Sequence, residues 1–430
     1  MTYEESILYL ESLTSFGIKP GISRIEALLV ALGNPEKKYK TVHITGTNGK
    51  GSVAAFLANG ILASGVSVAR FTSPHLLSYT ERMTVNGVDI SEENFCKALA
   101  VVREASEKLV AEGMESPTQF EVLTAMAFWY FAEKEVTYAV IEAGLGGLLD
   151  STNVVTPVVS VITNVTMDHM AYMGDTVEAI AEHKAGIIKH GVPVVTAAQG
   201  SALKIIQKKA HKEECRLYTY DKDFAVTSRS KMHYSQMITV EVKDKEKMML
   251  ISSMPGLHQS VNMAVAAMAM YVLHQQDEMV SLDGMREGFA RTSWPGRFEI
   301  VKGLGRTFVF DGAHNASGAE SFAMTYLELF GTKPKKVVFS MLEDKDLSAV
   351  VSLAIGSDDE VFTVPAPTPR GIQPEELAKK MPVRATAHHS VSLGMEEAVE
   401  ASEEGDIIVV CGSLYILGEA RSWLTKKLAQ

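Results

Sequence analysis

Cysteine is scarce in this chain of 430 residues, with only Cys96, Cys215 and Cys411, far apart in the sequence. An odd, scattered set predicts neither a disulfide framework nor a cysteine-based metal site, and it favours a reducing compartment. Long apolar runs are also lacking: no stretch of about 18 apolar residues occurs, which argues against a membrane-spanning helix. Residues Met1 to Glu11 lack the basic flank and apolar segment of a signal peptide. We therefore expect a cytoplasmic protein.

Positive charge is in deficit, with 41 Lys and Arg against 52 Asp and Glu and a net charge of −11. Because this excess of acidic groups repels phosphates, we expect neither a nucleic-acid partner nor an anionic membrane surface. A small phosphate ligand remains compatible, since it responds to the local field of its pocket. The length predicts two or three domains, and 46% apolar residues supply ordinary globular cores.

Strand-like and helical segments alternate up to about Lys212. Strands are predicted at Thr41–Thr45, Ser67–Phe71, Tyr138–Glu142, Val158–Thr163 and Val192–Thr196, and helices at Lys50–Ala63, Glu92–Ala111, Thr118–Ala132, Thr176–Ile188 and Ser201–Lys212. This alternation predicts an α/β fold with a mostly parallel, P-loop-type sheet and helices on both faces. The segment from Arg216 to Ser253 breaks the alternation, and its polar, β-rich pattern predicts a small antiparallel flap.

A second α/β region is predicted after a linker. Pro295 and Gly296, in Trp294-Pro-Gly-Arg297, stop regular structure on both sides, so we place the linker there. Strands are predicted beyond it at Thr307–Phe310, Lys336–Phe339, Glu360–Val364 and Asp406–Val410. We therefore predict an N-terminal domain of residues 1–295 and a smaller, Rossmann-like domain of residues 296–430.

A phosphate-binding loop is predicted where the strand Thr41–Thr45 meets the helix that starts at Lys50. Backbone N–H groups and a helix N-terminus attract anions, Lys50 adds positive charge, and Ser52 can hold Mg²⁺. The motif is not a strict G-x-x-x-x-G-K-S, because Gly51 is inserted before Ser52. An ordinary glycine-rich turn is the alternative, but the order of strand, turn, lysine and hydroxyl favours a phosphate cradle. Its residues are Gly46, Thr47, Asn48, Gly49, Lys50, Gly51 and Ser52.

Glu142 ends an apolar strand and precedes Gly144, Gly146 and Gly147. Ligands bind at the carboxyl edge of open α/β sheets, and a carboxylate there can hold Mg²⁺. A solvated glutamate is the alternative, but the glycines favour close backbone approach. His169 also follows a predicted strand, yet Mg²⁺ usually prefers oxygen ligands, so its spacing alone assigns it no role.

The phosphate loop resembles that of the Mur-ligase superfamily, in the form found in folylpolyglutamate synthases and dihydrofolate synthases. Other motifs of this family follow in order along nearly the whole chain: Thr72-Ser-Pro-His-Leu76 with Glu81-Arg82, Ile141-Glu-Ala-Gly-Leu-Gly-Gly147 with Asp150-Ser-Thr-Asn153, Met167-Asp-His169, Glu182-His-Lys-Ala-Gly-Ile-Ile-Lys189, Gly256-Leu-His-Gln259 with Asn262, Trp294-Pro-Gly-Arg297, Asp311-Gly-Ala-His-Asn315 and Gly412-Ser-Leu-Tyr415. Each motif alone is only weakly specific for the family, but the whole set in this order is highly specific.

The resemblance implies a metal site for ATP with two Mg²⁺ ions. Ser73, Glu142 and His169 match the family residues that bind one magnesium ion. Lys184 matches a lysine that is carbamylated, which turns a cation into an additional carboxylate near the metals. Without the resemblance, Lys184 is an ordinary lysine of an amphipathic helix. Lys50, Lys184 and His169 are the catalytic candidates.

The resemblance also implies a second set of nucleotide contacts. His258 and Asn262 match residues near the adenine, although helix caps are the alternative. Arg297 matches a phosphate contact and is otherwise a solvated linker charge. Asp311 and His314 match ribose and phosphate contacts. If these matches hold, ATP is bridged between the two predicted domains, whose closure is part of the mechanism.

The activity implied by the resemblance is an ATP-dependent ligase that joins L-glutamate to folate, to dihydropteroate or to both, through an acyl phosphate. Only 45 residues precede Gly46, too few for the uridine-nucleotide domain of cell-wall Mur ligases. Leu148 stands where the family commonly has arginine, which leaves the substrate preference open. Alternatives are a Mur-type ligase for another carboxylate and amino acid, a plain P-loop NTPase or kinase, and an ATP-sensing paralogue without activity. We expect a monomer.

Overall fold

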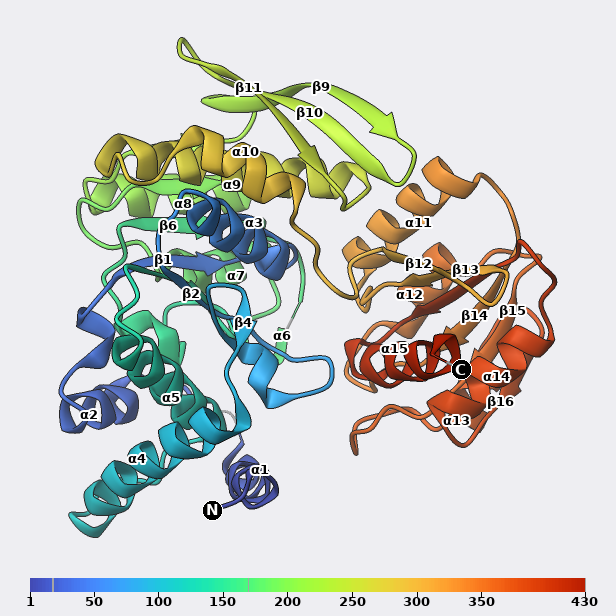
Figure 1. Ribbon diagram of the computed structural model, residues 1–430, viewed down its shortest axis with the longest axis horizontal. Helices are drawn as coiled ribbons and strands as arrows, with labels where there is room; N and C mark the ends of the chain where they lie inside the picture. The colour runs from blue at the N-terminus through green and yellow to red at the C-terminus, as the bar shows by residue number, and fades with distance from the viewer. Residues whose placement is uncertain (18, 169, 430) are drawn as a thin grey trace. The chain divides into compact units, whose positions relative to one another are not determined.

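The computed structural model describes residues 1–17, 19–168 and 170–429 (Figure 1). It divides the chain into two compact units: unit 1 comprises Met1–Ser228, Ile238–Ile251 and Val261–Thr292, and unit 2 comprises Arg229–Met237, Ser252–Ser260 and Ser293–Gln430. The domain boundary at residues 295 and 296 stays a prediction. His169, predicted to bind metal and to take part in catalysis, lies outside the described residues.

Unit 1 is built on an eight-stranded sheet with the order β4-β3-β2-β5-β1-β6-β7-β8. The strands are β1 (Lys40–Thr45), β2 (Val68–Phe71), β3 (Met83–Val85), β4 (Val88–Asp89), β5 (Tyr138–Glu142), β6 (Val159–Ile162), β7 (Val194–Thr196) and β8 (Leu217–Thr219). From β2 to β8 the neighbouring strands are parallel, whereas β3 and β4 form an antiparallel edge. The predicted mostly parallel sheet is confirmed.

Helices cover both faces of this sheet (Figure 1). They are α1 (Tyr3–Ser12), α2 (Ser23–Ala31), α3 (Lys50–Ala63), α4 (Glu92–Ala111), α5 (Gln119–Glu133), α6 (Met170–Met173), α7 (Val177–Ala185), α8 (Gly200–Lys212), α9 (Leu257–Gln276) and α10 (Leu282–Ala290), with short 3₁₀ turns at Leu13–Phe16, Pro35–Lys37, Tyr79–Arg82 and Ser151–Val154. Helices α2, α4 and α5 pack on one face over Phe71 and Ile141, while α3 lies on the other. None of the described helices is both long and apolar enough to span a bilayer.

The predicted helix Thr176–Ile188 is shorter in the structure, because α7 ends at Ala185 and Gly186 follows it. A Cβ on Gly186 would lie 2.3 Å from Leu148 Cα, so the glycine allows the loop after β5 to pass close to the end of the helix. Thr176 caps the other end by accepting a hydrogen bond from Ala179 N.

Helices α3 and α10 pack so closely that glycine is required where they meet. A Cβ on Gly288 would lie 2.2 Å from Asn59 O and 2.6 Å from Gly60 N, both backbone atoms of α3. Backbone atoms in a helix cannot move aside to relieve such a clash, whereas the end of a flexible side chain can. The two helices must therefore separate to accept any larger residue.

Replacing Gly288 by alanine is expected to lower the free energy of unfolding by about 1–3 kcal/mol, the usual cost of overpacking. Chemical denaturation of the purified variant measures this. The matched control is Glu287→Ala, one residue away on the same helix, where the side chain is 52% exposed and a change within about 0.5 kcal/mol is expected. Equal stability of the two variants would contradict the close packing of α3 and α10.

A small three-stranded sheet follows unit 1's main sheet, in the order β11-β10-β9. Its strands are β9 (Phe224–Met232), β10 (Ser235–Val242) and β11 (Lys247–Ser252). The two-residue connection at His233 and Tyr234 makes β9 and β10 antiparallel, as predicted for the flap. The predicted start of the flap at Arg216 is wrong, because Leu217–Thr219 pairs in parallel with β7. A three-residue strand has too few residues for its alternation to be informative.

Unit 2 contains a six-stranded sheet with the order β12-β13-β17-β14-β15-β16. Its elements are β12 (Glu299–Gly303), β13 (Arg306–Phe310), α11 (Ala316–Phe330), β14 (Lys335–Phe339), α12 (Leu347–Ala354), β15 (Glu360–Thr363), α13 (Pro374–Lys379), β16 (Ala385–Ala387), α14 (Val391–Glu400), β17 (Ile407–Cys411) and α15 (Leu414–Leu428). All strands run parallel except β12, the antiparallel edge. Its core includes Phe298, Phe322 and Phe339. The predicted second α/β fold is confirmed.

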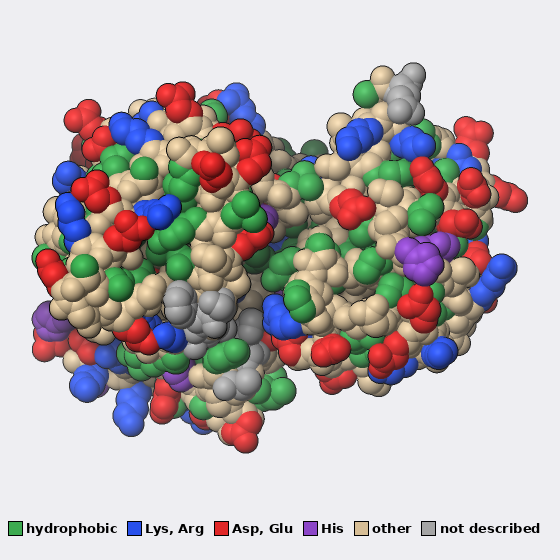
Figure 2. Space-filling view, turned by 90° about the horizontal axis from the view of Figure 1, so that it is seen from below, with side chains coloured by type: hydrophobic (Ala, Val, Ile, Leu, Met, Phe, Trp, Pro, Cys, Tyr) green, Lys and Arg blue, Asp and Glu red, His purple; other side chains and the backbone are tan. Residues whose placement is uncertain are grey.

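Acidic and basic side chains are interspersed over the face of the molecule that Figure 2 shows. Such mixing is typical of a surface in contact with water rather than with a polyanion. Parallel strands direct their loops toward the carboxyl edge of a sheet, which is where the predicted phosphate loop and Glu142 lie.

Candidate active site

The predicted phosphate loop leaves β1 at the carboxyl edge of the unit 1 sheet, between β5 and β6. Ile44 is in register with Glu142 on β5, so the loop begins beside that carboxylate. Helix α3 begins at Lys50, directly after Gly49, whose φ of +85° favours glycine. The predicted order of strand, turn and helix is confirmed, and it directs a helix N-terminus toward the loop.

Two glycines of the loop are required by their neighbours. A Cβ on Gly46 would lie 1.8 Å from Thr163 Oγ1, and a Cβ on Gly49 would lie 2.3 Å from Asn262 Oδ1. Both glycines also have positive φ, +154° and +85°. Asn262, at 8% exposure, therefore lies against the phosphate loop. The structure brings this predicted nucleotide residue and the loop together.

Side chains that follow β6 hold the phosphate loop in its shape. Asn164 accepts hydrogen bonds from Thr47 N through its backbone oxygen (3.0 Å) and from Asn48 N through Oδ1 (2.9 Å). Thr163 Oγ1 donates to Asn48 O at 2.6 Å. Neither Thr163 nor Asn164 was predicted from the sequence as part of the site. Their position as polar residues directly after an apolar strand was the available signal.

Lys50 and Lys184 are two lysines of this region, and Lys184 is the more deeply buried. Lys50 Nζ donates to Gly46 O (2.9 Å) and Thr47 O (3.2 Å), within the loop. Lys184 is 3% exposed. Burial and, to a lesser degree, the positive charge of Lys50 lower its pKa to about 7, while Asp168 and Asp150 oppose the shift. An amine with such a pKa is partly neutral near pH 7.

Glu142 and the loop that carries Ser73 are in contact, as the predicted metal site requires. Glu142 is 4% exposed, and its Oε2 accepts a hydrogen bond from Ser73 N at 3.2 Å. The carboxylate helps to keep Arg70 charged, although burial lowers the pKa of this guanidinium to about 10. Ser52, in the first turn of α3, is fully buried. Arg70 was not identified from the sequence.

The oxygen donors of this region are of the kinds that magnesium binds. Among the described residues, no group of three or more His, Cys, Asp or Glu is arranged to hold a metal ion. Mg²⁺ needs no such cage, because it keeps several waters and is commonly bound by one or two carboxylates together with substrate phosphates. Glu142 supplies a carboxylate and Ser52 a hydroxyl of the required kinds.

Glu81 holds the loop that carries Ser73. Its carboxylate accepts hydrogen bonds from the backbone N–H groups of Leu76, Leu77 and Ser78, each at 2.8 Å. A carboxylate that binds three backbone donors fixes a loop that has no regular structure of its own. The sequence motif included Glu81, but only the structure shows this contact.

A second buried network lies under the glycine-rich loop after β5. Asp150 accepts hydrogen bonds from Leu145 N (2.7 Å) and from Thr152 N and Oγ1. Thr152 Oγ1 also contacts His43 Nε2 at 2.8 Å, and burial lowers the pKa of that histidine to about 3. Neutral His43 therefore helps to support the loop, a role that was not predicted from the sequence.

Unit 2 brings Arg297 and Asp311 together. Asp311 Oδ2 accepts a hydrogen bond from Phe298 N, and Oδ1 accepts one from Ala313 N, both at 2.8 Å. Burial raises the pKa of Asp311 to about 6, although the charge of Arg297 opposes the shift. A Cβ on Gly312 would lie 2.4 Å from Arg297 Nη1 and 2.3 Å from Leu414 Cδ2, so the guanidinium lies against this glycine.

His258 and His314, the two histidines of unit 2 that were predicted to contact the nucleotide, lie near Arg297 and Asp311 respectively. Burial and, to a lesser degree, the charges of Arg297 and Arg229 lower the pKa of His258 to about 4. His258 is therefore neutral at pH 7 and can donate or accept a hydrogen bond. His314 Nδ1 contacts Gly312 O at 2.7 Å, next to Asp311.

The glycine-rich loop follows β1, whose neighbours β5 and β6 both run parallel to it, and it lies near a buried carboxylate and two lysines. This arrangement defines a P-loop protein. Two family models match the chain: the Mur ligase middle domain over residues 44–270 and the Mur ligase glutamate ligase domain over residues 296–414. The chain therefore belongs to the Mur ligase family, in the group of folylpolyglutamate and dihydrofolate synthases, as full-length relatives show.

Two relatives and one solved structure illustrate this similarity. The chain is 36% identical to the folylpolyglutamate synthase of Lacticaseibacillus casei, covering 99% of each. It is 33% identical to the dihydrofolate synthase/folylpolyglutamate synthase of Bacillus subtilis, covering 98% of this chain and 99% of the relative. The Escherichia coli protein solved in complex with DHPP and ADP superposes with a TM-score of 0.87 at 27% identity, covering 99% and 98% of the two chains.

Proposed function

We propose that this protein is an ATP-dependent ligase that adds L-glutamate to a folate through an acyl-phosphate intermediate. The phosphate loop, with its helix N-terminus and Lys50, carries the proposal. Full-length similarity to relatives named folylpolyglutamate synthase supports the choice of substrates. The E. coli relative, solved with ADP, supports a nucleotide in the reaction.

The proposed chemistry has two transfers. A carboxylate oxygen of the folate attacks the γ-phosphorus of ATP, the bond to the bridging β–γ oxygen breaks, and ADP leaves. The amine of glutamate then attacks the acyl carbon, phosphate leaves with the electron pair of the carbon–oxygen bond, and the nitrogen loses a proton. The protein's contribution is placement and charge stabilisation, because phosphoryl transfer needs little covalent help.

In this proposal the phosphate loop and Lys50 hold the triphosphate, and Asn262 binds beside the loop. Ser52, Ser73 and Glu142 are the proposed magnesium ligands, with His169 proposed from the resemblance alone. Mg²⁺ would supply charge neutralisation to the phosphates. In unit 2, His258, Arg297, Asp311 and His314 are the proposed nucleotide contacts.

A dihydropteroate substrate is the second proposal. The B. subtilis relative carries both activities in its name, and the E. coli relative was solved with DHPP. Leu148, which replaces the arginine common in the family, is 47% exposed and its N–H donates to His183 O at 2.7 Å. The position therefore lies beside the end of α7, and a leucine there offers no charge to an acidic substrate. A cytoplasmic location and a monomeric state stay predictions.

Phosphate release in the presence of ATP and Mg²⁺ tests the proposed function. We expect release only when glutamate and either a folate or dihydropteroate are both present, and the ligated product is identified by mass spectrometry. Release that ignores glutamate would instead indicate an NTPase, and stimulation by muramyl peptide precursors but not by folates would indicate a cell-wall ligase. Omitting each substrate in turn also separates the two pteridine substrates.

Carbamylation of Lys184 is a further part of the proposal. The neutral amine attacks the carbon of CO₂ and loses one proton, so the reaction needs a deprotonated lysine. Burial and Lys50 lower the pKa of Lys184 to about 7. The neutral fraction therefore rises as pH increases through 7 and falls below it. Carbamylation would place a negative charge near Lys50.

Labelling with ¹³CO₂ is expected to give a carbamate signal in ¹³C NMR that weakens as pH falls from 8 to 6 and is missing in Lys184→Ala. This variant should also lose roughly 10- to 100-fold of kcat, as for other groups that support a metal site. Lys189→Ala is the matched control, since Lys189 lies close by and donates to Asn153 O at 3.0 Å. A signal of equal strength in Lys184→Ala would exclude carbamylation at this lysine.

A further inference from the structure

The backbone on both sides of Arg297 is held by carboxylates. Gly296 N donates to Glu299 Oε2 at 3.0 Å, and Phe298 N donates to Asp311 Oδ2 at 2.8 Å. Gly296 O accepts a hydrogen bond from Gly312 N at 2.9 Å. The peptide groups before and after Arg297 are thus fixed, which fixes the direction in which its side chain leaves the chain.

Phe298 adopts a conformation that its neighbours must enforce. Its φ is +48°, a region that bulky residues rarely occupy. The ring is 1% exposed and lies 5.6 Å from the ring of Phe322 and 6.5 Å from that of Phe330. The buried ring and the hydrogen bonds of Gly296 N and Phe298 N together hold this turn, next to Arg297, in its strained conformation.

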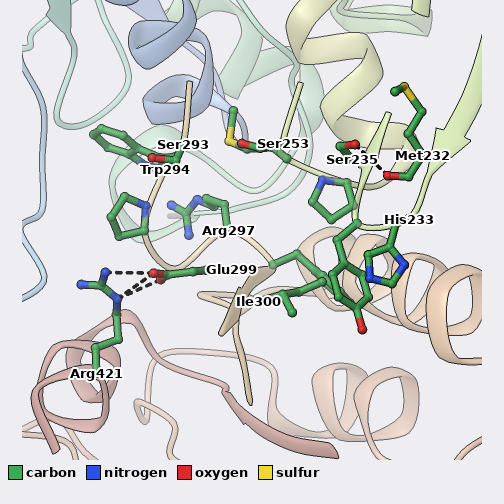
Figure 3. A pocket seen from close by; sticks show the side chains of 15 residues that line it. Met232, His233, Ser235, Ser253, Ser293, Trp294, Arg297, Glu299, Ile300 and Arg421 are labelled. Atoms are coloured by element: carbon green, nitrogen blue, oxygen red, sulfur yellow. Dashed lines mark hydrogen bonds and ion pairs between the residues drawn. The ribbon is translucent and has the colours of Figure 1, made fainter. Parts of the chain in front are cut away.

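Glu299 is itself held by Arg421 of α15. Arg421 Nη2 donates to Glu299 Oε1 at 2.9 Å, and Nε lies 2.8 Å from Oε2. The side chains of Arg421 and Glu299 are 30% and 21% exposed. Figure 3 shows this pair, together with Arg297, around a cavity of about 550 Å³ within unit 2. One carboxylate thus connects helix α15 to the backbone of the linker.

We propose that Glu299 and Arg421 are positioning residues for Arg297. This inference rests on the proposed function, in which Arg297 contacts the phosphates of ATP. Glu299 acts through the Gly296 peptide, and Arg421 acts by fixing the Glu299 carboxylate. Without the ion pair, neither the Glu299 side chain nor the Gly296 N–H that donates to it is held in place, and the turn relaxes. Because phosphoryl transfer depends on the placement of charge, a displaced guanidinium lowers the rate even when it is still present.

The test is a set of variants assayed for steady-state ligation: Glu299→Gln, Arg297→Lys, the combination of both, and Arg421→Lys. We expect Glu299→Gln to lower kcat roughly 10- to 100-fold with the KM of glutamate unchanged. The double variant should be no slower than Arg297→Lys alone, because Glu299 acts only through the position of the Arg297 guanidinium. Arg421→Lys, which keeps the charge, should retain an intermediate kcat.

Glu360→Gln is the matched control, since the Glu360 carboxylate is 15% exposed and also bridges two cations, Lys336 and Arg384. It is expected to keep the wild-type kcat. Thermal unfolding is followed in parallel, and Arg421→Lys carries the test in case Glu299→Gln does not fold. A kcat of Glu299→Gln within about twofold of wild type, or losses that multiply in the double variant, would overturn the inference. A wild-type protein without ligation would overturn the proposed function instead.

Discussion

Replacing Lys50 by methionine is expected to lower kcat/KM for ATP about a thousandfold or more, because a preorganised charge at the transferring phosphoryl group contributes several powers of ten. Methionine keeps most of the side-chain length and removes the charge. Lys50 Nζ donates to Gly46 O and Thr47 O, and bound phosphate oxygens are better acceptors for a cation than these neutral carbonyls. The measurement is steady-state ADP formation, together with calorimetric binding of a nonhydrolysable ATP analogue.

Lys40→Met is the matched control for this prediction. Lys40 is the first residue of β1, and the phosphate loop follows the other end of this strand. Its Nζ forms an ion pair with Asp277 Oδ2 at 2.6 Å, and 46% of the lysine side chain is exposed. Its loss removes the same charge from the opposite end of the same strand, so kcat/KM should stay within about twofold of wild type, because exposed ion pairs contribute little. Equal losses in the two variants would show a general effect of charge and contradict the proposed role of Lys50.

Replacing Glu142 by glutamine is expected to raise the Mg²⁺ concentration for half-maximal activity at least about tenfold and to lower kcat at saturating Mg²⁺. The amide has nearly the same shape but lacks the charge that a hard cation requires. It also leaves the buried guanidinium of Arg70 with less negative charge nearby. We therefore expect a lower Tm as well, which a thermal melt measures independently of activity.

Glu36→Gln is the matched control for Glu142. Both carboxyl groups are in unit 1 and are buried to a similar degree, 6% and 4% exposed, but Glu36 lies in the turn before β1 rather than at the carboxyl edge of the sheet. Its substitution should leave the Mg²⁺ dependence unchanged. An unchanged Mg²⁺ requirement in Glu142→Gln would remove Glu142 from the proposed ligand set.

Much of the fold followed from the sequence because its signals are local. Apolar strands of four to six residues, each followed by a polar or glycine-rich turn and a longer helix, predict parallel βα units wherever they occur. The strands β1, β5 and β6 and the helix that starts at Lys50 were found this way. Two short strands were not found, because β8, at Leu217–Thr219, and β4, at Val88–Asp89, contain too few residues to show a period. The equally short β7 was predicted because it belongs to the apolar segment that begins at Val192.

In the candidate site, too, the residues that were predicted are those with a local sequence signal. Gly46, Gly49, Lys50 and Ser52 could be named because one loop contains all of them, and the strand-end position of Glu142 is also a local feature. By contrast, Arg70 beside Glu142 was not predicted, because a single arginine in a strand has no distinguishing pattern.

The sequence by itself determined the class of the protein: the order of strand, phosphate loop and helix, and the ordered motifs of the Mur ligase family, are properties of neighbouring residues. Only the tertiary structure decided which distant groups meet. Thr163 and Asn262 lie against the loop glycines, Lys184 is buried within reach of the charge of Lys50, and Arg421 holds Glu299. These contacts depend on the order of strands in a sheet and on how helices pack over it. The strand order and the helix packing are those that minimise the free energy of the whole chain, and no single segment of the sequence shows them.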